Sequence, residues 1–518
     1  MKRRDLLNER GSGVLVHLTS LPGPFGCGDL GPSAHRLVKQ LGRARQRFWQ
    51  MLPVCPVGAG NAPYSSPSSF AGSPLLVSPQ MLARDGLLNA RALQRFGALP
   101  ARRVNYRATA RKREVLLREA YATFRNDAAR ADRARFETFQ RKQGAWLNDH
   151  TLFMALKVFN RGASWTDWEE GLRLREPQAL SRAREKHAGE IEYHTFVQYQ
   201  FDRQWRALTD AARAEGVRLV GDLPFYVEHD SSDVWAHRDI FELDRQGRPR
   251  AVAGVAPDLF SESGQLWGNP LFNWNALARR GYSWWVKRLE RSLDLFDILR
   301  LDHFIAFHRA WAVPARARTA RRGAYRPGPG AKLFTTLRAK LGGLPFIAED
   351  LGTMVPEVHV LRDQFDLPGM HVLQFSFADD AALSKPFTCP RRAVIYTGTH
   401  DNNTSLGWFR DRGGRGNTRT PAQMEAARAC LLRYLGRGAR GAEIHWDLIR
   451  LAFMSAANIA IVPLQDVLGL GSSARMNMPG TARGNWEWRY DEGDLTDRAL
   501  ERLAGLTDIY GRTSEPHA

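Results

Sequence analysis

The chain has 518 residues, and 43% of them are hydrophobic, which is enough to bury a sizeable core. A formal net charge of +20 and a pI near 10.3 raise nucleic acid or an anionic membrane surface as partners. However, only ten of the 74 basic residues are lysine, and the arginines are spread from end to end. This spread favours a compositional bias over a nucleic-acid footprint.

The cysteine spacing and the amino-terminal segment indicate whether to expect a metal site, a disulfide framework or a signal peptide. Four cysteines occur without CxxC spacing, so we expect neither a metal site nor a dense disulfide framework, and no feature requires a cofactor. The start, MKRRDLLNERGSG, lacks the apolar stretch of a signal peptide. The longest apolar region, 451–464, is too short to span a bilayer. We therefore expect a cytoplasmic protein without a nucleic-acid or membrane partner, and the oligomeric state is left open.

Near-continuous apolar segments recur along the chain and predict strands that are buried on both faces of a parallel sheet. In chain order they are 14–18, 48–54, 217–227, 296–304, 345–351, 369–377, 393–400 and 458–468. Helix-period stretches such as 33–45, 335–341 and 424–435 lie between several of them. Eight strands alternating with helices predict an α/β fold, a (β/α)8 TIM barrel, as a single catalytic unit over 1–518.

Two long interruptions break this alternation. Residues from about 80 to 210 are rich in Ala, Arg, Glu and Leu and show helical periodicity, which predicts a helical insertion between strands 2 and 3. Residues from about 228 to 290 are rich in Gly, Pro and aromatics and follow strand 3. Because long loops at the carboxyl ends of barrel strands commonly build active sites, we expect an active-site loop there. The arginine-rich stretch 316–322, beside Pro and Gly, is interpreted as a solvated loop.

Three acids follow apolar runs directly: Asp302, Glu349 and Asp401. On a strand, Arg300 would point the same way as Asp302 and keep it ionised, which suits a nucleophile; a buried structural pair is the alternative. Glu349 stands next to a second acid and at a strand end near other carboxylates, so like charges and partial burial would raise its pKa, as a general acid requires. The alternative for Glu349 is an ordinary surface acid.

Asp401 follows His400, and this pair could hydrogen-bond two adjacent hydroxyls of a sugar ring. A metal site is weakly supported, since no further His or Cys cluster accompanies the pair. A Ser-His-Asp triad lacks the GxSxG elbow. All three acids fall where a barrel presents its active face, and paired carboxylates are what glycosidic-bond chemistry needs.

Aromatic residues fit a sugar ligand. Trp267, Phe272 and Trp274 share one predicted loop, and Tyr64 and Phe70 share another. Sugar rings present C–H faces that pack on such surfaces. The alternative is that most of the 15 tryptophans belong to the core.

These residues lie in motifs that resemble the 4-α-glucanotransferase family, also called amylomaltase or disproportionating enzyme, of the α-amylase-like clan. The motifs are VHLTSLPGPFGCGDLG, APYSSPSSFAGSPLL, VGDLPFYVEHDSSDVWAH, VAGVAPDLFSESGQLWGNPLFNW, RLDHF, IAEDLG, YTGTHDNNT and SARMNMPGT. They run in order from residue 16 to about 482, so the resemblance covers nearly the whole chain.

The resemblance implies a retaining mechanism with defined roles. Asp302 matches the nucleophile, Glu349 the general acid/base and Asp401 the transition-state stabiliser. Asp222 matches an acid that orients the sugar nearest the cleavage point, and Arg300 and His400 match hydroxyl and carboxylate partners. The matching positions in the donor and acceptor subsites are Tyr64, Asp258, Gln265, Trp267, His303 and Asn477. Two departures are Ile305, where relatives usually carry a polar residue, and Leu18, where proline is common.

The resemblance therefore implies a 4-α-glucanotransferase that acts on α-1,4-glucans and maltooligosaccharides. Three alternatives remain at this point. An amylase-type hydrolase would share the acids, and products from maltotriose separate hydrolysis from transfer. A non-catalytic glucan-binding protein would lose nothing on Asp302→Asn. A nucleic-acid binder, suggested by charge alone, predicts salt-sensitive retention on DNA.

Overall fold

The computed structural model describes residues 6–257, 263–352, 355–377, 385–413, 419–436, 443–481 and 483–513. Its centre is a sheet of eight parallel strands in the order β10-β11-β12-β1-β2-β3-β6-β9. The strands are β1 (Gly11–Leu15), β2 (Phe48–Gln50), β3 (Arg218–Leu223), β6 (Ile298–Leu301), β9 (Phe346–Ala348), β10 (Gly369–Val372), β11 (Ala393–Tyr396) and β12 (Ile459–Pro463). Each lies within one of the eight predicted segments or overlaps it, and nearly all their residues are buried. The predicted α/β barrel is confirmed.

The barrel closes between the two end strands, β9 and β10, through bonds outside the regular ladder. The Ala348 N–H donates to the Pro368 carbonyl at 2.9 Å. The Met370 N–H donates to Oδ1 of Asp350 at 2.8 Å. A side chain therefore supplies one of the links at the seam of the barrel.

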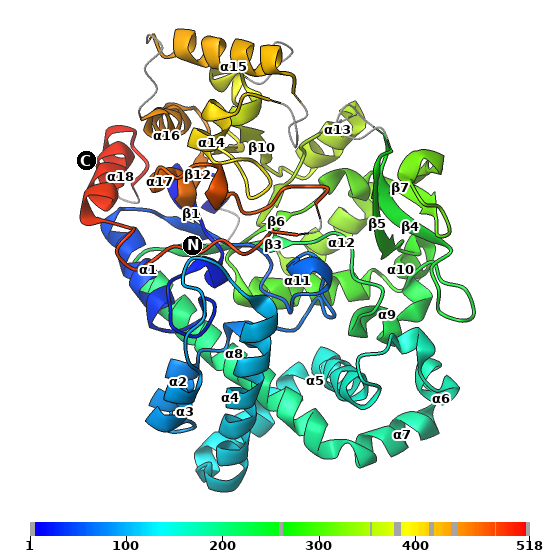
Figure 1. Ribbon diagram of the computed structural model, residues 1–518. Coiled ribbons are helices and arrows are strands. Elements are labelled where there is room, and N and C mark those ends of the chain that lie inside the picture. Colours follow the sequence, from blue (N-terminus) through cyan, green and yellow to red (C-terminus); the bar gives the residue numbers. More distant parts are fainter. Residues whose placement is uncertain are drawn as a thin grey trace.

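An outer layer of helices covers the sheet (Figure 1). In chain order it contains α1 (Pro32–Arg43), α8 (Ala188–Ala214), α11 (Ser283–Leu295), α12 (Gly330–Leu341), α13 (Pro356–Gln364), α16 (Ile444–Met454) and α18 (Asp497–Ile509). The predicted alternation is less regular between β10 and β11, where the described residues form two 3-10 turns, η9 (Leu373–Phe375) and η11 (Pro386–Thr388). Helices α14 (Ser405–Arg410), α15 (Pro421–Tyr434) and α17 (Leu464–Val467) complete the carboxyl-terminal part.

Helices fill the chain between β2 and β3 and extend away from the barrel (Figure 1). They are α2 (Pro79–Arg84), α3 (Ala90–Arg95), α4 (Tyr106–Asp127), α5 (Arg130–Phe159), α6 (Glu170–Arg173), α7 (Pro177–Lys186) and α8. Helix α8 packs on α4 and α5 and also on α1 and β3, so it joins the excursion to the barrel. The side-chain amide of Gln198 in α8 pairs with both the N–H and the C=O of Gly72, at 2.8 and 2.9 Å.

A four-stranded antiparallel sheet stands beside the barrel, in the order β5-β4-β7-β8. Its strands are β4 (Ala251–Val255), β5 (Gln265–Pro270), β7 (Arg309–Pro314) and β8 (Ala324–Pro327). Two come from the excursion after β3, which also holds α9 (Ser232–Ala236) and α10 (Trp274–Arg279), and two come from the excursion after β6. The excursion after β3 thus contains strands and helices where we expected a loop. The arginines of 316–322 are exposed, as expected, in the β7–β8 connection.

The two ends of the described chain meet at the amino-terminal side of β12. Arg512 donates to the carbonyls of Phe453, at 2.7 Å, and Gly11, at 3.0 Å. Arg10 donates to the same Phe453 carbonyl at 2.9 Å and to that of Ser455 at 2.9 Å. Because the last carbonyls of a helix lack partners inside the helix, the two guanidinium groups cap α16. None of the described helices combines the length and the hydropathy of a segment that crosses a bilayer.

Candidate active site

Acidic side chains gather where the barrel strands end. Asp222 is in β3, Asp302 follows β6, Glu349 follows β9, and Asp401 lies shortly after β11. Because the strands are parallel, their carboxyl ends share one face of the barrel, which is the face that holds active sites in this fold. Arg300, in β6, lies between two of these acids.

Arg300 is a buried cation at the floor of the site. Its Nη1 atom donates to both carboxylate oxygens of Asp222, at 2.8 and 2.9 Å, and to Oδ1 of Asp302 at 3.0 Å. Burial lowers the pKa of Arg300, but the two carboxylates outweigh burial and hold this pKa well above its usual value. The Arg300 side chain is 4% exposed and that of Asp302 is 26% exposed. The expected Arg300–Asp302 pairing is therefore present, and Asp302 stays open to a ligand.

Glu349 has the surroundings of a carboxyl group that holds its proton. Burial raises the pKa of Glu349 to about 8, with Arg300 opposing this shift and Asp302 adding to it. The backbone N–H groups of His303, at 2.7 Å, and Leu351, at 3.2 Å, donate to the carboxyl oxygens and also oppose the shift. The predicted rise in pKa is therefore present.

Of the like charges expected near Glu349, the strand-end carboxylate is responsible and the adjacent acid is not. The adjacent acid, Asp350, accepts the Met370 N–H and pairs with Arg362 at 2.5 Å. Successive side chains of an extended chain point to opposite faces, so Asp350 serves the barrel seam while Glu349 faces the site. The acid that raises the pKa of Glu349 is Asp302, from a different strand.

Tyr64 links two sides of the site from the segment after β2. Its hydroxyl donates to Oδ2 of Asp222 at 2.8 Å and lies 2.9 Å from Nε2 of His400. Its ring stacks on the His400 ring, with centroids 5.2 Å apart and an interplanar angle of 19°, and Trp486 packs on both rings. Burial raises the pKa of Tyr64 well above its usual value, so the hydroxyl remains a donor.

Asp401 is held by a neighbouring loop. Nδ2 of Asn477 donates to its Oδ1 at 2.6 Å, and Nη2 of Arg475 donates to its backbone carbonyl at 2.6 Å. The Asp401 N–H donates to the Thr399 hydroxyl at 3.3 Å. One carboxylate oxygen lies 3.5 Å from Nε2 of His400, and the side chain is 45% exposed. The carboxylate is thus oriented and accessible.

Trp267, His303 and Gln265 form one wall of the site. The Trp267 and His303 rings meet edge to face with centroids 4.8 Å apart, and Trp267 Nε1 donates to Gln265 Oε1 at 3.1 Å. Trp267 is 40% exposed, an unusual exposure for so large an apolar side chain. Burial lowers the pKa of His303 to about 4, so its imidazole is neutral near pH 7. His303 also has a φ of 51°, a strained conformation of the kind that clusters at functional sites.

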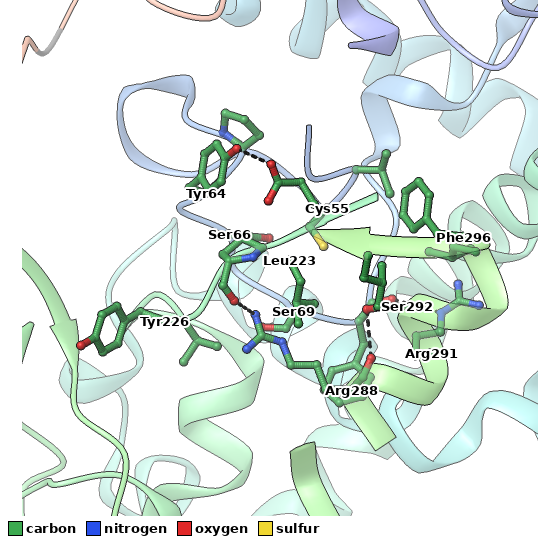
Figure 2. A pocket seen from close by; sticks show the side chains of 18 residues that line it. Cys55, Tyr64, Ser66, Ser69, Leu223, Tyr226, Arg288, Arg291, Ser292 and Phe296 are labelled. Atoms are coloured by element: carbon green, nitrogen blue, oxygen red, sulfur yellow. Dashed lines mark hydrogen bonds between the residues drawn. The ribbon is translucent and has the colours of Figure 1, made fainter. Parts of the chain in front are cut away.

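A pocket adjoins Asp222 and Tyr64 and extends towards α11 (Figure 2). Its lining comes from the segments after β2 and β3 and from α11, and it includes Cys55, Ser66, Ser69, Arg288 and Arg291. Arg288 crosses this space and donates to the carbonyls of Pro224, at 2.5 Å, and Phe225, at 3.1 Å. Helix α11 therefore anchors the chain that leaves β3.

The remaining predicted positions have plain outcomes. Asp258 lies outside the described residues. The two departures from the family pattern are core residues, since Ile305 is 9% exposed and Leu18 is fully buried. Arg475 and Trp486 contact predicted site residues but were missed; the SARMNMPGT motif, which contains Arg475, was the available signal. Among the described residues, no group of three or more His, Cys, Asp or Glu side chains could hold a metal ion.

The chain is similar to known proteins over almost its whole length. Residues 16–496 match the glycoside hydrolase family 77 profile, described as 4-alpha-glucanotransferase. The chain is 44% identical to a 4-alpha-glucanotransferase of Thermus thermophilus, covering 97% of this chain and 99% of that protein. It is 40% identical to a chloroplastic/amyloplastic 4-alpha-glucanotransferase of Solanum tuberosum, covering 99% of this chain and 88% of that one.

Solved structures agree with these sequence matches. Amylomaltase from Streptococcus agalactiae, in complex with acarbose, superposes with a TM-score of 0.92 at 34% identity, covering 98% of this chain and 100% of that chain. Amylomaltase from Corynebacterium glutamicum shares the fold, with a TM-score of 0.76 at 18% identity, covering 98% of this chain and 76% of that one. By its full-length sequence match and its barrel, the chain belongs to the 4-alpha-glucanotransferase family.

Proposed function

We propose that this protein is a retaining 4-α-glucanotransferase, which moves α-1,4-glucan segments from a donor to the 4-hydroxyl of an acceptor glucan or glucose. The observation that carries the proposal is the family match over residues 16–496 together with the carboxylates gathered at the strand ends. We further propose that 1–518 acts as one catalytic unit, with the excursions after β2 and β3 supplying walls of the site.

In the first step Asp302 attacks the anomeric carbon while Glu349 donates its proton to the departing glycosidic oxygen. A covalent glucosyl–Asp302 ester forms, and the reducing-end piece leaves with that proton. The raised pKa of Glu349, about 8, supports this role because the carboxyl group is protonated at neutral pH. The Arg300 contact at 3.0 Å supports an oriented Asp302.

In the second step the ionised Glu349 removes the proton of an acceptor 4-hydroxyl, whose oxygen attacks the anomeric carbon, breaks its bond to the carboxylate oxygen and releases Asp302. Asp401 would bind ring hydroxyls more tightly in the oxocarbenium-like transition state than in the ground state, which lowers the barrier. Its bond from Asn477, at 2.6 Å, supports an orientation fixed before substrate arrives.

The other predicted positions would bind sugar around the cleavage point. Asp222, Arg300, Tyr64 and His400 form one hydrogen-bonded unit that suits the hydroxyls of the sugar at the reacting carbon. Trp267 is exposed enough to take a sugar face, and Gln265 and His303 adjoin it. Asp258 is assigned to a subsite by the family motif alone.

Incubation with maltotriose tests the reaction. A transferase yields glucose and a ladder of longer maltooligosaccharides, whereas a mixture of short sugars without longer products would establish the amylase-type hydrolase instead. Asp302→Asn should lower kcat at least about 10³-fold, since covalent catalysis is lost. The isosteric variant should keep the thermal unfolding profile of the wild type to within a few degrees, which separates lost chemistry from lost fold.

A further inference from the structure

Two loops beside the site are joined by a buried carboxylate. The β2 loop (63–72) carries Tyr64, and the β3 loop (224–233) follows Asp222 along the chain. Oδ2 of Asp233 accepts the backbone N–H of Ser69 at 2.8 Å. Asp233 is 3% exposed and lies in the first turn of α9, so it is fixed at both its backbone and its side chain.

Further bonds reinforce the same junction. The Ser65 hydroxyl donates to Glu228 Oε2 at 2.6 Å, and the Ser232 N–H donates to the Pro67 carbonyl at 2.9 Å. The junction therefore has bonds at three positions along the β2 loop, all immediately after Tyr64. A displacement of this loop would shift Tyr64 directly.

Asp233 is a buried acceptor at the centre of this junction. Burial raises the pKa of Asp233 to about 6, opposed by the Ser69 N–H and by the charge of Arg288. A buried polar group that lacks its partners disfavours folding, so the bonds from Ser69 and from the backbone N–H of Asp233 itself fix this side chain in one orientation. Cys55 lies within electrostatic range of this carboxylate, and its thiol stays neutral near pH 7 because burial raises its pKa to about 12.

We propose that Asp233 is a positioning residue, which holds the β2 loop so that the Tyr64 hydroxyl stays between Asp222 and His400. The Tyr64 hydroxyl meets both partners at once, at 2.8 and 2.9 Å, so a small shift of the loop breaks at least one bond. Asp233 touches neither partner. It acts through Ser69 and Tyr64, on the sugar subsite that the proposed function assigns to Asp222 and His400.

A double-mutant cycle tests this inference, which rests on the proposed function. Asp233→Ala and Tyr64→Phe are measured singly and together by kcat and KM for maltotriose. Asp233→Ala should lower kcat/KM on the order of tenfold, because the loop loses its buried acceptor. In the Tyr64→Phe background the same substitution should lower kcat/KM by less than about twofold, since the group it positions is already absent.

If the loss of kcat/KM in the double variant equals the product of the losses in the two single variants, the proposal is overturned, because Asp233 would then act independently of Tyr64. Asp233→Asn keeps an oxygen that accepts the Ser69 N–H and should restore most of the lost activity; no recovery would also count against a positioning role. Should Asp233→Ala fail to fold, Ser65→Ala cuts the junction at a partly exposed residue. Ser65→Ala should lower kcat/KM by less than Asp233→Ala does, and its effect should also be non-additive with that of Tyr64→Phe. Additive effects of Ser65→Ala and Tyr64→Phe would contradict the proposal.

Two controls separate the causes of failure. Asp294→Ala removes an exposed acid from α11 and should leave kcat and KM unchanged. The wild-type product ladder from maltotriose decides the proposed function by itself. If the wild type only hydrolyses maltotriose, transfer is wrong, yet the cycle measured on hydrolysis still decides whether Asp233 acts through Tyr64.

Discussion

Asp302 and Glu349 share one site but differ in what surrounds them. Asp302 faces a guanidinium at 3.0 Å, whereas Glu349 meets backbone N–H groups and the charge of Asp302. In the proposed mechanism these different surroundings divide the work of nucleophile and acid between the two carboxyl groups. The difference in surroundings depends on residues from two strands, so neither acid would have the same environment without the other strand.

The pH dependence of turnover should follow Glu349. Because the pKa of Glu349 is about 8, we expect kcat/KM for maltotriose to hold steady near pH 7 and to fall above pH 8. The fall should approach about tenfold per pH unit, as for loss of one essential proton. Initial rates of glucose release across pH 5.5–10 would measure it. A plateau that persists to pH 10 would contradict the assignment of Glu349 as the acid.

Glu349 should also reduce stability at alkaline pH. Its pKa is raised from 4.5 to about 8 by folding, so its favourable contribution is complete below pH 4.5 and is lost as the pH rises through 8. Glu349→Gln has no proton to lose and should unfold at a higher temperature than the wild type at pH 9. At about 1.36 kcal/mol per pKa unit, less a discount for solvent access, the gain is a few kcal/mol. A difference between the two proteins that does not change with pH would contradict this account.

At the scale of elements, α8 fixes the segment after β2. The Gln198 amide binds both the N–H and the C=O of Gly72, and the Gln204 amide binds Ser78 in the same way, at 2.7 and 3.3 Å. These side-chain amides thus supply, to residues outside any strand, the backbone hydrogen bonds that a neighbouring strand supplies in a sheet. The excursion after β2 is joined to the β2 loop by these contacts.

Gln198→Ala should lower the free energy of unfolding by about 2–3 kcal/mol, because two buried backbone groups lose their partners. Denaturant unfolding followed by circular dichroism would measure the change. Gln94→Ala, at an exposed position in α3, is the matched control and should change the same quantity by less than about 0.5 kcal/mol. Equal effects of the two substitutions on the free energy of unfolding would mean that the Gly72 contacts do not stabilise the fold.

The strands of the antiparallel sheet were not predicted from the sequence. The eight barrel strands are apolar runs buried on both faces, so their pattern is visible without a partner. Strands β7 and β8 hold exposed Arg, Pro and Tyr residues, and β8 is exposed along its length. Strand β7 pairs with β4, which lies more than 50 residues earlier in the chain, and β8 pairs in turn with β7. No local pattern reports the β4–β7 pairing.

At the scale of the whole molecule, the two chain ends are joined by arginine. The Arg512 guanidinium donates to several main-chain carbonyls, and burial, with the charge of Arg10 adding to it, lowers its pKa to about 9. Arg512→Met should lower the free energy of unfolding by about 2–4 kcal/mol, because buried carbonyls lose their donors. Thermal unfolding would measure it, with the exposed Arg498→Met as control. A loss as small as that of the control would contradict the cap.

The barrel and the Arg300–Asp302 pair could be predicted because both depend on local periodicity. The contacts of Tyr64 with Asp222 and His400 span 158 and 336 residues. Family motifs placed these residues in one site without saying how they touch. Asp233 was not predicted, because an acid at a helix start looks like an ordinary first-turn residue until its burial is known.

The barrel seam has a consequence for the timing of catalysis. Glu349 lies between Ala348 and Asp350, the two residues that link β9 to β10. A local opening of the barrel at this seam would therefore displace the proposed proton carrier. Opening events of this kind expose backbone amides to solvent exchange. The hydrogen-exchange rates of the Ala348 and Met370 amides therefore report how often the seam opens and displaces Glu349. We expect a bound glucan that bridges the cleft to slow both rates.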